Sequence, residues 1–565
     1  MLPDPRPSER RSRWEGTVER VVEPVSIRPD DPKVEQSPLP SESAGAWTWA
    51  SSWASSLTWT VALMLGTTLL FGAGLATTDL WAPDEPRYAA IAEELREMRH
   101  GVSGLVLLHL NDTVYTQKPP LYFWLAALAG TPGSHVSEFA ARLPSALAGL
   151  LGVALTLWIG RRLIPGRFVP LLAGGILATS FRFVFTARRA QLDVLLTTLE
   201  LFAIACFLFL DARRSAAPSR RDILALVGLH SALGLAALTK GPAGWLPLAV
   251  IAAFLSWEGR TRSLRRLIPA WSLLLSVAPL VAWVSASTLL APEGYFQTAV
   301  VDNVFGRIVE GTSHARPIYY YLYQLPLNFL PWGLALPLTL LWLGAHRRKA
   351  PLAQTVSPES VRFLICWIAL PLIVFSLSAG KRAGYLLPVF PALALATAAA
   401  LVAYLGGSQP KPAAKRLALA IAGIAALELV LLVGVAPRLN ASKSPRPIAA
   451  SLAGHNNAVR GIGLYDLSPL EGGLLYYGAG PIERLDGLKA LESFQREGGE
   501  VVLMRARHAV ELGDRYALRT IDSFRAGDRA LKLVAFVRDT HESTAFSGHP
   551  AGQSHLAVKP AEQPR

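Results

Sequence analysis

The sequence has few cysteines and none of the common cofactor motifs. Only Cys206 and Cys366 occur among 565 residues, and both lie inside apolar runs, where we expect small buried side chains. This excludes a disulfide framework. No GxxxxGKS, GxxxxGKT, GxGxxG or CxxC pattern is present, so the sequence gives no support to a nucleotide site or a zinc ribbon.

Long apolar runs are abundant instead. Hydrophobic residues make up 51% of the chain, the mean hydropathy is +0.33, and several runs reach the roughly 18–20 residues that cross a bilayer as a helix. We therefore expect a polytopic α-helical membrane protein with about 11–13 transmembrane helices. Eleven candidate spans are Leu57–Thr77, Leu143–Gly160, Phe168–Thr186, Val194–Leu210, Ile223–Leu238, Ala243–Trp257, Leu267–Leu290, Leu325–Ala345, Val361–Ser378, Tyr385–Leu405 and Leu417–Ala436.

Arg and Lys residues cluster in every second loop between these runs. The net charge is +14, but this distribution marks cytoplasmic loops rather than a nucleic-acid surface. The scheme requires that Leu121–Ala129, about ten residues long, does not span and forms a juxtamembrane or re-entrant helix. It makes the N-terminus cytoplasmic and loop 78–142 extracytoplasmic. The residue usage is typical of a bacterium, so we expect the inner membrane.

Four regions follow from these patterns. Residues 1–50 are expected to be a disordered basic cytoplasmic tail, and 51–436 the transmembrane domain. Residues 437–540 are expected to form a small extracytoplasmic α/β domain, followed by a disordered tail at 541–565. Within 437–540, the predicted strands are Ile462–Tyr465, Val501–Met504 and Leu531–Val537, and the predicted helices are Gly487–Gln495 and Arg507–Leu512.

The stretch Pro83–Ala89 carries adjacent carboxylates, Asp84 and Glu85, just after the first span. Charge beside hydrocarbon is costly and usually serves binding or chemistry. A simpler interpretation makes Asp84 the N-cap of an amphipathic helix through Met98 that lies along the membrane surface, with Pro86 in its first turn. The two interpretations are compatible, since a helix N-terminus also attracts an anion.

The other outer loops also carry charged or aromatic residues next to apolar runs. Each has a simple explanation: Lys118 could snorkel, Arg188, Arg189 and Asp193 could form an interfacial ion pair, His314 could be solvated, and Tyr319–Tyr321 could be an aromatic belt. Lys381, Arg382 and Tyr385 open a late span against the positive-inside trend. Separate explanations for each residue do not predict that all of these side chains lie at one leaflet. Binding of a lipid-linked phosphate does predict it.

An ordered set of short motifs resembles the bacterial GT-C glycosyltransferases. This group of enzymes includes the 4-amino-4-deoxy-L-arabinose lipid A transferases and the dolichyl-phosphate-mannose–protein mannosyltransferases. The resemblance covers roughly residues 57–405. The motifs are Asp84-Glu85, Lys118-Pro119-Pro120-Leu121, Arg142-Leu143-Pro144, Arg189–Asp193, Thr239-Lys240-Gly241-Pro242 and Lys381-x-x-x-Tyr385-x-x-Pro388.

The resemblance implies roles for individual residues. It makes Asp84 and Asp193 catalytic with Glu85 in support, and assigns the lipid phosphate to Lys118 and Tyr385. The remaining candidates are, for the phosphate, Arg307, Lys381 and Arg382, and for the wider site Arg87, Tyr88, Arg189, Lys240, Asn303 and His314. Two departures, Gln117 before Lys-Pro-Pro and Asp302-Asn303 where a histidine is expected, weaken the case for a metal and for aminoarabinose. No cofactor is required, and a divalent cation is left open.

The function expected from this resemblance is sugar transfer from a polyprenyl-phosphate donor to a lipid A-like glycolipid or a protein hydroxyl. Asp84 would take the acceptor proton in an inverting displacement, and fixed cations would stabilise the leaving phosphate. The alternatives are a lipid or solute transporter with an outer-leaflet anion site, and a non-catalytic membrane scaffold. A transporter would favour charges near the midplane in inverted repeats, which this sequence does not show.

Overall fold

The computed structural model describes residues 42–214, 219–306, 315–347, 356–406, 410–454, 461–513, 515–526 and 529–536. The chain divides into two units, residues 1–55 and 56–565. In the first unit, only the beginning of helix α1 (Glu42–Gly72) is described. The tails predicted at 1–50 and 541–565 therefore lie outside the described residues, except that 42–50 are helical.

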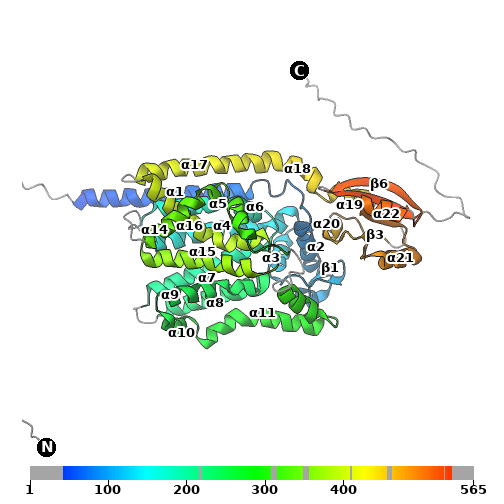
Figure 1. Cartoon of the computed structure of the whole chain (residues 1–565), viewed down its shortest axis with the longest axis horizontal. Coiled ribbons are helices and arrows are strands. Elements are labelled where there is room, and N and C mark those ends of the chain that lie inside the picture. The colour runs from blue at the N-terminus through cyan, green and yellow to red at the C-terminus, as the bar shows by residue number, and fades with distance from the viewer. Residues whose placement is uncertain are drawn as a thin grey trace, which may run out of the picture. The chain divides into compact units, whose positions relative to one another are not determined.

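Long apolar helices dominate the second unit (Figure 1). Among the described residues, seven helical segments can cross a membrane by length and composition, or up to nine if two bent pairs each count as one span. The seven segments contain α4 (Glu138–Leu163), α7 (Leu192–Ala212), α8 (Arg220–Lys240) counted together with α9 (Leu246–Trp257), α11 (Ala270–Leu290), α15 (Pro358–Leu377), α16 (Phe390–Gly406) and α17 (Pro410–Val430).

The connection between α8 and α9 reverses the chain, as two separate predicted spans require. A continuous helix over Arg220–Trp257 would contain 38 residues and measure about 57 Å, well beyond a hydrocarbon core of about 30 Å. Gly241 ends α8 with a φ of +69°. A Cβ at Gly244 would stand 2.3 Å from the backbone of Ala236, so the short helix η2 (Gly241–Trp245) folds back against α8.

Two predicted spans are broken rather than continuous. The predicted span Phe168–Thr186 forms α5 (Phe168–Ala178) and α6 (Phe181–Ala187), which meet at 64°. The predicted span Leu325–Ala345 is also bent: α13 (Tyr320–Asn328) meets the helical segment made of η5 (Trp332–Ala335) and α14 (Leu336–Arg347) at 118°. The two breaks bind each other. Phe181 N–H donates to the Leu330 carbonyl at 2.8 Å, and Trp332 Nε1 donates to Thr179 Oγ1 at 3.0 Å.

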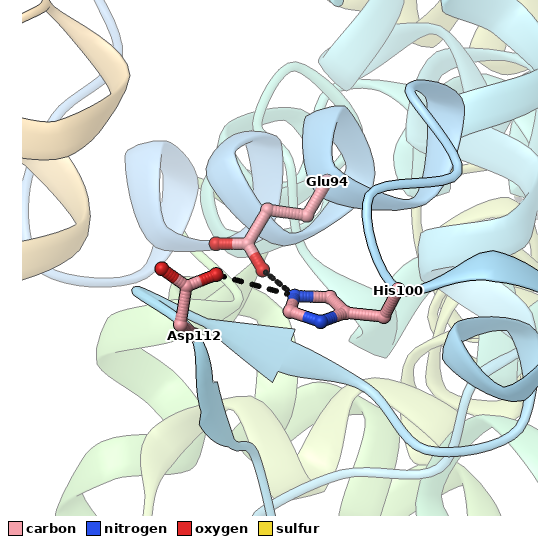
Figure 2. A group of neighbouring side chains, drawn as sticks. All are labelled: Glu94, His100 and Asp112. Carbon is pink, nitrogen blue, oxygen red and sulfur yellow. Dashed lines mark hydrogen bonds and ion pairs between the residues drawn. The ribbon is translucent and has the colours of Figure 1, made fainter.

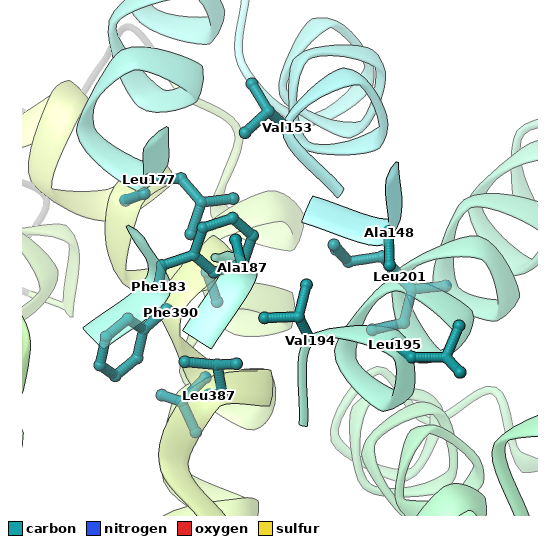
Figure 3. Close-up of a cluster of buried hydrophobic side chains, with 14 of the residues drawn as sticks. Ala148, Val153, Leu177, Phe183, Ala187, Val194, Leu195, Leu201, Leu387 and Phe390 are labelled. Carbon is teal, nitrogen blue, oxygen red and sulfur yellow. The ribbon is translucent and has the colours of Figure 1, made fainter. Parts of the chain in front are cut away.

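The core of the bundle lies where α4, α5, α6, α7 and α16 meet. Figure 3 shows apolar side chains from these helices turned toward one another, with Phe183, Val194 and Phe390 all fully buried. In an apolar 18-residue stretch of Ala383–Leu405, which contains η7 (Ala383–Val389) and α16, 89% of the residues are buried, whereas in such a stretch of Pro412–Asn440 only 6% are buried. The start of η7 and the start of α7 therefore adjoin this closely packed core.

The large loop between α1 and α4 is itself folded. It contains α2 (Asp84–Arg96), η1 (Gly101–Leu105), the hairpin β1 (His109–Leu110) and β2 (Thr113–Val114), and α3 (Leu121–Gly130). The ten-residue α3 confirms that Leu121–Ala129 is a short helix. Residues Asn111 and Asp112 turn the hairpin with φ values of +58° and +57°, which suits a tight two-residue turn.

The last part of the unit is a five-stranded sheet with the order β4-β3-β5-β7-β6. Its strands are β3 (Ile462–Tyr465), β4 (Ile482–Leu485), β5 (Val501–Arg505), β6 (Leu518–Ala526) and β7 (Arg529–Phe536). Strand β3 pairs in parallel with β4 and β5, and β7 pairs antiparallel with β5 and β6. The helices are α18 (Ala436–Lys443), α19 (Arg446–Ala453), α20 (Ser468–Tyr476), α21 (Leu488–Arg496) and α22 (Ala506–Gly513); the π-helical η8 (Leu431–Val435) joins α17 to α18. The predicted elements are present, and β4, β6, α18, α19 and α20 are additional.

Candidate functional site

Helix α2 begins at Asp84, but Asp84 does not cap it. The N-cap residue is Pro83, and no side chain makes a capping hydrogen bond there. Pro86 lies in the first turn as expected. Most of the helix is buried, including Tyr88, Ile91 and Leu95, because α3 and α4 cover one side and α20 covers another. The surface amphipathic helix expected from the sequence is therefore wrong, since protein covers both sides of α2.

Glu85 is a buried structural centre. Only 1% of its side chain is exposed, and it forms an ion pair with Arg189 at 3.1 Å and another with Arg142 at 2.9 Å. The backbone N–H groups of Trp81 and Ala190 donate to it at 3.0 and 2.9 Å. Burial opposes its ionisation, but Arg189, Arg142 and these hydrogen bonds outweigh burial and hold the pKa of Glu85 below its ordinary value. Glu85 thus joins α2, α4 and the segment before α7.

Two buried arginines secure the end of α1 to the same region. Arg142 donates to the carbonyls of Leu75, Thr78 and Asp79 at 2.6–2.8 Å. Arg188 donates to the Leu70 and Ala73 carbonyls, both at 2.5 Å. Carbonyls at a helix C-terminus lack intrahelical partners, so these contacts satisfy them. Arg188, Arg189 and Asp193 do not pair with one another as the simpler interpretation predicted; each binds another segment.

Asp84 lies on a different side of α2 from Glu85. Its carboxylate pairs with Arg87 in the next turn, lies 3.9 Å from Arg382 Nη1, and is 21% exposed. Arg87 stands 5.6 Å from the Tyr88 ring and 6.0 Å from the Tyr115 ring. Burial, followed by the Asp84 carboxylate, raises the pKa of Tyr88 well above its ordinary value, so Tyr88 is a neutral hydroxyl. Asp84 is the accessible carboxylate of the pair.

Asp193 and Lys240 form a second charged pair, built from the start of α7 and the end of α8. The Lys240 ammonium binds Asp193 Oδ1, and Lys240 Nζ lies 4.4 Å from the centre of the Tyr385 ring. A Cβ at Gly384 would stand 3.4 Å from Asp193 Oδ2, so η7 passes directly beside the carboxylate. Asp193 is 22% exposed and Lys240 15%. Both therefore remain accessible at this end of the bundle.

The segment before η7 is held by contacts with residues 315–321. Lys381 is buried, and its ammonium donates to the carbonyls of Ser378 and Arg316, the latter at 3.0 Å. The Tyr321 hydroxyl donates to the Arg382 carbonyl at 3.1 Å. Lys381 is thus turned to the backbone, whereas Arg382 is 46% exposed and faces Asp84.

Lys118 approaches from the large loop, just before α3. Its charge acts on the Asp193 carboxylate, as does that of Arg182. Asn303, in the π-helical segment η4 (Gln297–Gly306), donates through Nδ2 to the Thr116 carbonyl at 3.3 Å and to the Thr298 carbonyl at 2.7 Å. This bond brings η4 beside the residues that precede Lys118. Arg307 and His314 lie outside the described residues.

Two charged residues near Asp193 were not selected from the sequence. Arg182 lies in α6 and Glu200 in α7, where Glu200 is 4% exposed and lies within the electrostatic reach of Lys240. Both are ionisable residues inside apolar runs, which is a recognised signal of function in membrane segments. That signal was available in the sequence.

The C-terminal sheet region packs against α2 through α20. A Cβ at Gly472 would come within 2.5 Å of Arg87 Cα, so the absence of a side chain there permits the close approach. The Tyr477 hydroxyl accepts from Leu80 N–H at 2.7 Å. Asn111 Nδ2 donates to Glu471 Oε1 at 3.3 Å and to the Ile482 carbonyl at 2.8 Å. The region thereby supports the loop that carries Asp84.

One group among the described residues has the donor atoms for a metal ion. It consists of Glu94, His100 and Asp112, whose ligand atoms lie within 4.8 Å of one another (Figure 2). Gln117 and Asp302 do not belong to it. The group lies toward the end of α2 opposite Asp84.

Comparisons with known proteins agree with this architecture. Residues 56–292 match the family model of dolichyl-phosphate-mannose-protein mannosyltransferase. An undecaprenyl phosphate-alpha-4-amino-4-deoxy-L-arabinose arabinosyl transferase of Pseudomonas fluorescens is 32% identical over 59% of this chain. A transferase of the same description from Enterobacter is 28% identical over 60% of it. The chain spans 58% of the length of each of these two relatives.

Solved structures show the same fold. ArnT from Cupriavidus metallidurans bound to undecaprenyl phosphate aligns with a TM-score of 0.68 at 20% identity, covering 84% of this chain and 98% of that one. The archaeal oligosaccharyltransferase AglB from Archaeoglobus fulgidus aligns with a TM-score of 0.54 at 13% identity, covering 81% of this chain and 70% of that one. These likenesses confirm the predicted resemblance to GT-C glycosyltransferases and the predicted fold class, a polytopic helical membrane protein with strands in its C-terminal region.

Proposed function

We propose that this protein transfers a sugar from a polyprenyl-phosphate donor to an acceptor hydroxyl or a similar group. The observation that carries the proposal is the meeting of two accessible carboxylates, Asp84 and Asp193, with cationic groups from separate segments. The names of the relatives and the undecaprenyl phosphate bound to ArnT support this donor class.

Asp84 is the proposed base. It takes the proton of the acceptor as the new glycosidic bond forms, and the polyprenyl phosphate leaves with the electron pair of the bond that breaks. Asp84 suits this role because it is accessible, whereas Glu85 already accepts from Arg142, Arg189 and two backbone N–H groups. Glu85 then keeps α2 in position.

The leaving phosphate is the second element of the mechanism. Its negative charge is stabilised by fixed cations and hydrogen-bond donors, so no general acid is needed. We assign this role to Lys118, Arg382 and Tyr385, with Arg307 retained as a candidate from the resemblance. Lys381 instead holds the backbone of this segment through the Arg316 and Ser378 carbonyls.

Asp193 and Lys240 complete the proposed site. Their mutual pairing and the contact of Lys240 with the Tyr385 ring fix both groups beside η7. There, Asp193 orients the sugar or the acceptor, and Lys240 keeps that carboxylate in position. Among the described residues, the group with metal donor atoms, Glu94, His100 and Asp112, lies away from these residues, and we assign no step of the transfer to the cation left open from the sequence.

The position in the membrane is also a proposal. Helix α7 runs from Asp193 to Asp211, about 27 Å at 1.5 Å per residue, which approaches the thickness of the hydrocarbon core. At its far end Arg260 pairs with Asp211 at 2.7 Å and with Glu359 at 2.8 Å. Since basic loops favour the cytoplasm, the Asp84 site would face the outer side of the bacterial inner membrane. The acceptor there is a lipid A-like glycolipid or a protein hydroxyl.

Mass spectrometry of lipid-linked sugars and outer glycoconjugates tests the proposal, in cells that carry the wild-type protein, no protein or Asp84→Asn. Without activity we expect a polyprenyl-phosphate sugar to accumulate and one glycoconjugate to lose that sugar. Asp84→Asn should match the deletion while the protein still inserts. Identical lipid and glycoconjugate pools in all three strains would contradict the proposal.

A further inference from the structure

Three ligand-type side chains converge beside the far end of α2. Glu94 comes from the last turns of the helix, His100 from the segment just after it, and Asp112 from the turn of the β1–β2 hairpin (Figure 2). His100 Nε2 lies 3.2 Å from Glu94 Oε2 and 3.5 Å from Asp112 Oδ1. We propose that these three residues bind a divalent transition-metal cation of the Zn²⁺ type, at a site separate from the transfer chemistry.

The separations suit shared coordination. Zn²⁺ binds imidazole nitrogen and carboxylate oxygen at about 2.1 Å, so neighbouring ligands of a tetrahedral site stand about 3.4 Å apart. The two observed separations, 3.2 and 3.5 Å, lie on either side of that value. Three protein ligands leave one position of the tetrahedron for water.

The charges also favour a cation. A buried carboxylate is costly without compensation, and Glu94 is only 7% exposed. The single Nε2 of His100 faces both carboxylates, and one N–H group serves only one acceptor well. Arg99 acts on both carboxylates but gives its hydrogen bond to Glu97 at 2.7 Å. A divalent cation between the three groups would compensate both carboxylates at once.

Neighbouring residues hold the ligand side chains in position, as is usual for metal ligands. The other oxygen of Glu94 accepts from Asn111 N–H at 2.8 Å, which fixes the carboxylate plane. The His100 ring stacks on His109, with 3.8 Å between ring centres and 20° between planes. Asp112 is 76% exposed, so the site opens to solvent on that side.

The site has a structural consequence for the loop. Glu94 lies ten residues after Asp84, about 15 Å along the helix, too far for a bound cation to touch the reacting groups. The cation would instead join the end of α2 to the hairpin, and the chain reaches Lys118 six residues after Asp112. It would thus fix Asp84 and Lys118 in one rigid loop.

Zn²⁺ binding by the purified full-length protein tests the proposal. The protein is stripped with a chelator in detergent, and Zn²⁺ is titrated in competition with a fluorescent indicator. The variants are His100→Ala and Glu94→Gln, where glutamine can still accept from Asn111. The matched control is His135→Ala, an exposed histidine of the same loop whose ring lies 3.4 Å from Ser134.

We expect one tight Zn²⁺ equivalent in wild type and in His135→Ala, and at least about tenfold weaker binding in the two ligand variants. Equal affinity in all four proteins, or no stoichiometric binding to wild type, would overturn the site. If His100→Ala does not fold, Asp112→Asn replaces it, because Asp112 is exposed. The visible spectrum of bound Co²⁺ should then weaken in Asp112→Asn, and an unchanged spectrum would also overturn the proposal.

Discussion

Asp84 and Glu85 are neighbours with the same charge and opposite surroundings. Glu85 is 1% exposed and bound by two arginines and two backbone N–H groups. Asp84 is 21% exposed and faces Arg87 and Arg382. Successive residues of a helix point about 100° apart, so one peptide step separates a saturated structural carboxylate from an accessible one. The number of donors that bind each carboxylate, rather than its charge or its position in the sequence, distinguishes the buried carboxylate from the accessible one.

The largest effect should come from removing Glu85. Glu85→Ala leaves Arg142 and Arg189 buried without their carboxylate, and breaking a buried pair in this way costs about 3–5 kcal/mol. We expect a much lower thermal unfolding midpoint and poor recovery of the detergent-purified protein. Glu85→Gln keeps the volume of the side chain, so its unfolding midpoint should lie between those of Glu85→Ala and wild type. A midpoint of Glu85→Ala within two degrees of wild type would show that the network is not structural.

Asp84→Asn should lower the activity strongly and the stability little. Loss of a general base lowers the rate by about 100-fold or more, while loss of a partly exposed ion pair changes stability by less than about 1 kcal/mol. Transfer from a polyprenyl-phosphate sugar in membranes, measured beside the unfolding midpoint, separates the two effects. Full transfer by Asp84→Asn would remove Asp84 from the mechanism.

Changes to the pair Asp193 and Lys240 should have effects on activity and stability that are intermediate between those of the two preceding changes. Lys240→Met removes the partner of Asp193 and the contact with Tyr385, and we expect about a tenfold lower kcat/KM with modest destabilisation. Lys240→Arg retains the charge and serves as the control. Because the two residues act together, Asp193→Asn combined with Lys240→Met should cost less than the sum of the single changes. Additive losses would argue against a functional pair.

Another buried carboxylate, Glu471, allows Glu85 to be compared with a group whose pKa is shifted in the opposite direction. Burial raises the pKa of Glu471, whereas the arginines lower that of Glu85. The contribution of Glu471 is therefore complete below its ordinary pKa and is lost as the pH rises through its raised value. The contribution of Glu85 is present above its ordinary pKa and is lost as the pH falls through its lowered value.

Glu471→Gln should consequently be the mildest change. Glutamine is neutral at every pH and can still contact Asn111, so we expect it to stabilise the protein by about 1 kcal/mol at high pH and by little at low pH. Unfolding midpoints between pH 5 and 8 measure this difference. A constant difference across that range would mean that Glu471 does not titrate there.

The sequence predicted what depends on local composition. Runs of about 20 apolar residues indicated most spans. The charged residues in the loops between them indicated that the candidate site lies at one end of the helical bundle. The breaks after Ala178 and before Trp332 were missed because hydrogen bonds between segments about 150 residues apart stabilise them. The missed strands β4 and β6 are the two edges of the sheet. They carry charges such as Glu483 and Asp522, which edge strands tolerate and which hide the apolar alternation.

The site was predicted as a set of residues but not as a set of pairs. Motif order selected Asp84, Asp193 and Lys240, whereas the partner of each depends on which helix face the packing exposes. Neither the attachment of Lys381 to backbone carbonyls nor the position of Glu94, His100 and Asp112 follows from spacing alone. Those contacts join segments through the tertiary fold.

The hydrogen bonds between the two broken helix pairs bear on how the chain is made. Thr179 and Ser180 of the first break are buried, whereas the Phe181 residue beside them is 51% exposed. The partners of Phe181 N–H and of the Thr179 hydroxyl, Leu330 and Trp332, follow about 150 residues later. A buried peptide group without a partner is unfavourable. During synthesis, the Thr179 hydroxyl can already donate to the Gly175 carbonyl, but Phe181 N–H lacks its Leu330 partner until the second break has left the ribosome. The early helices consequently reach their final packing only after most of the bundle has been inserted.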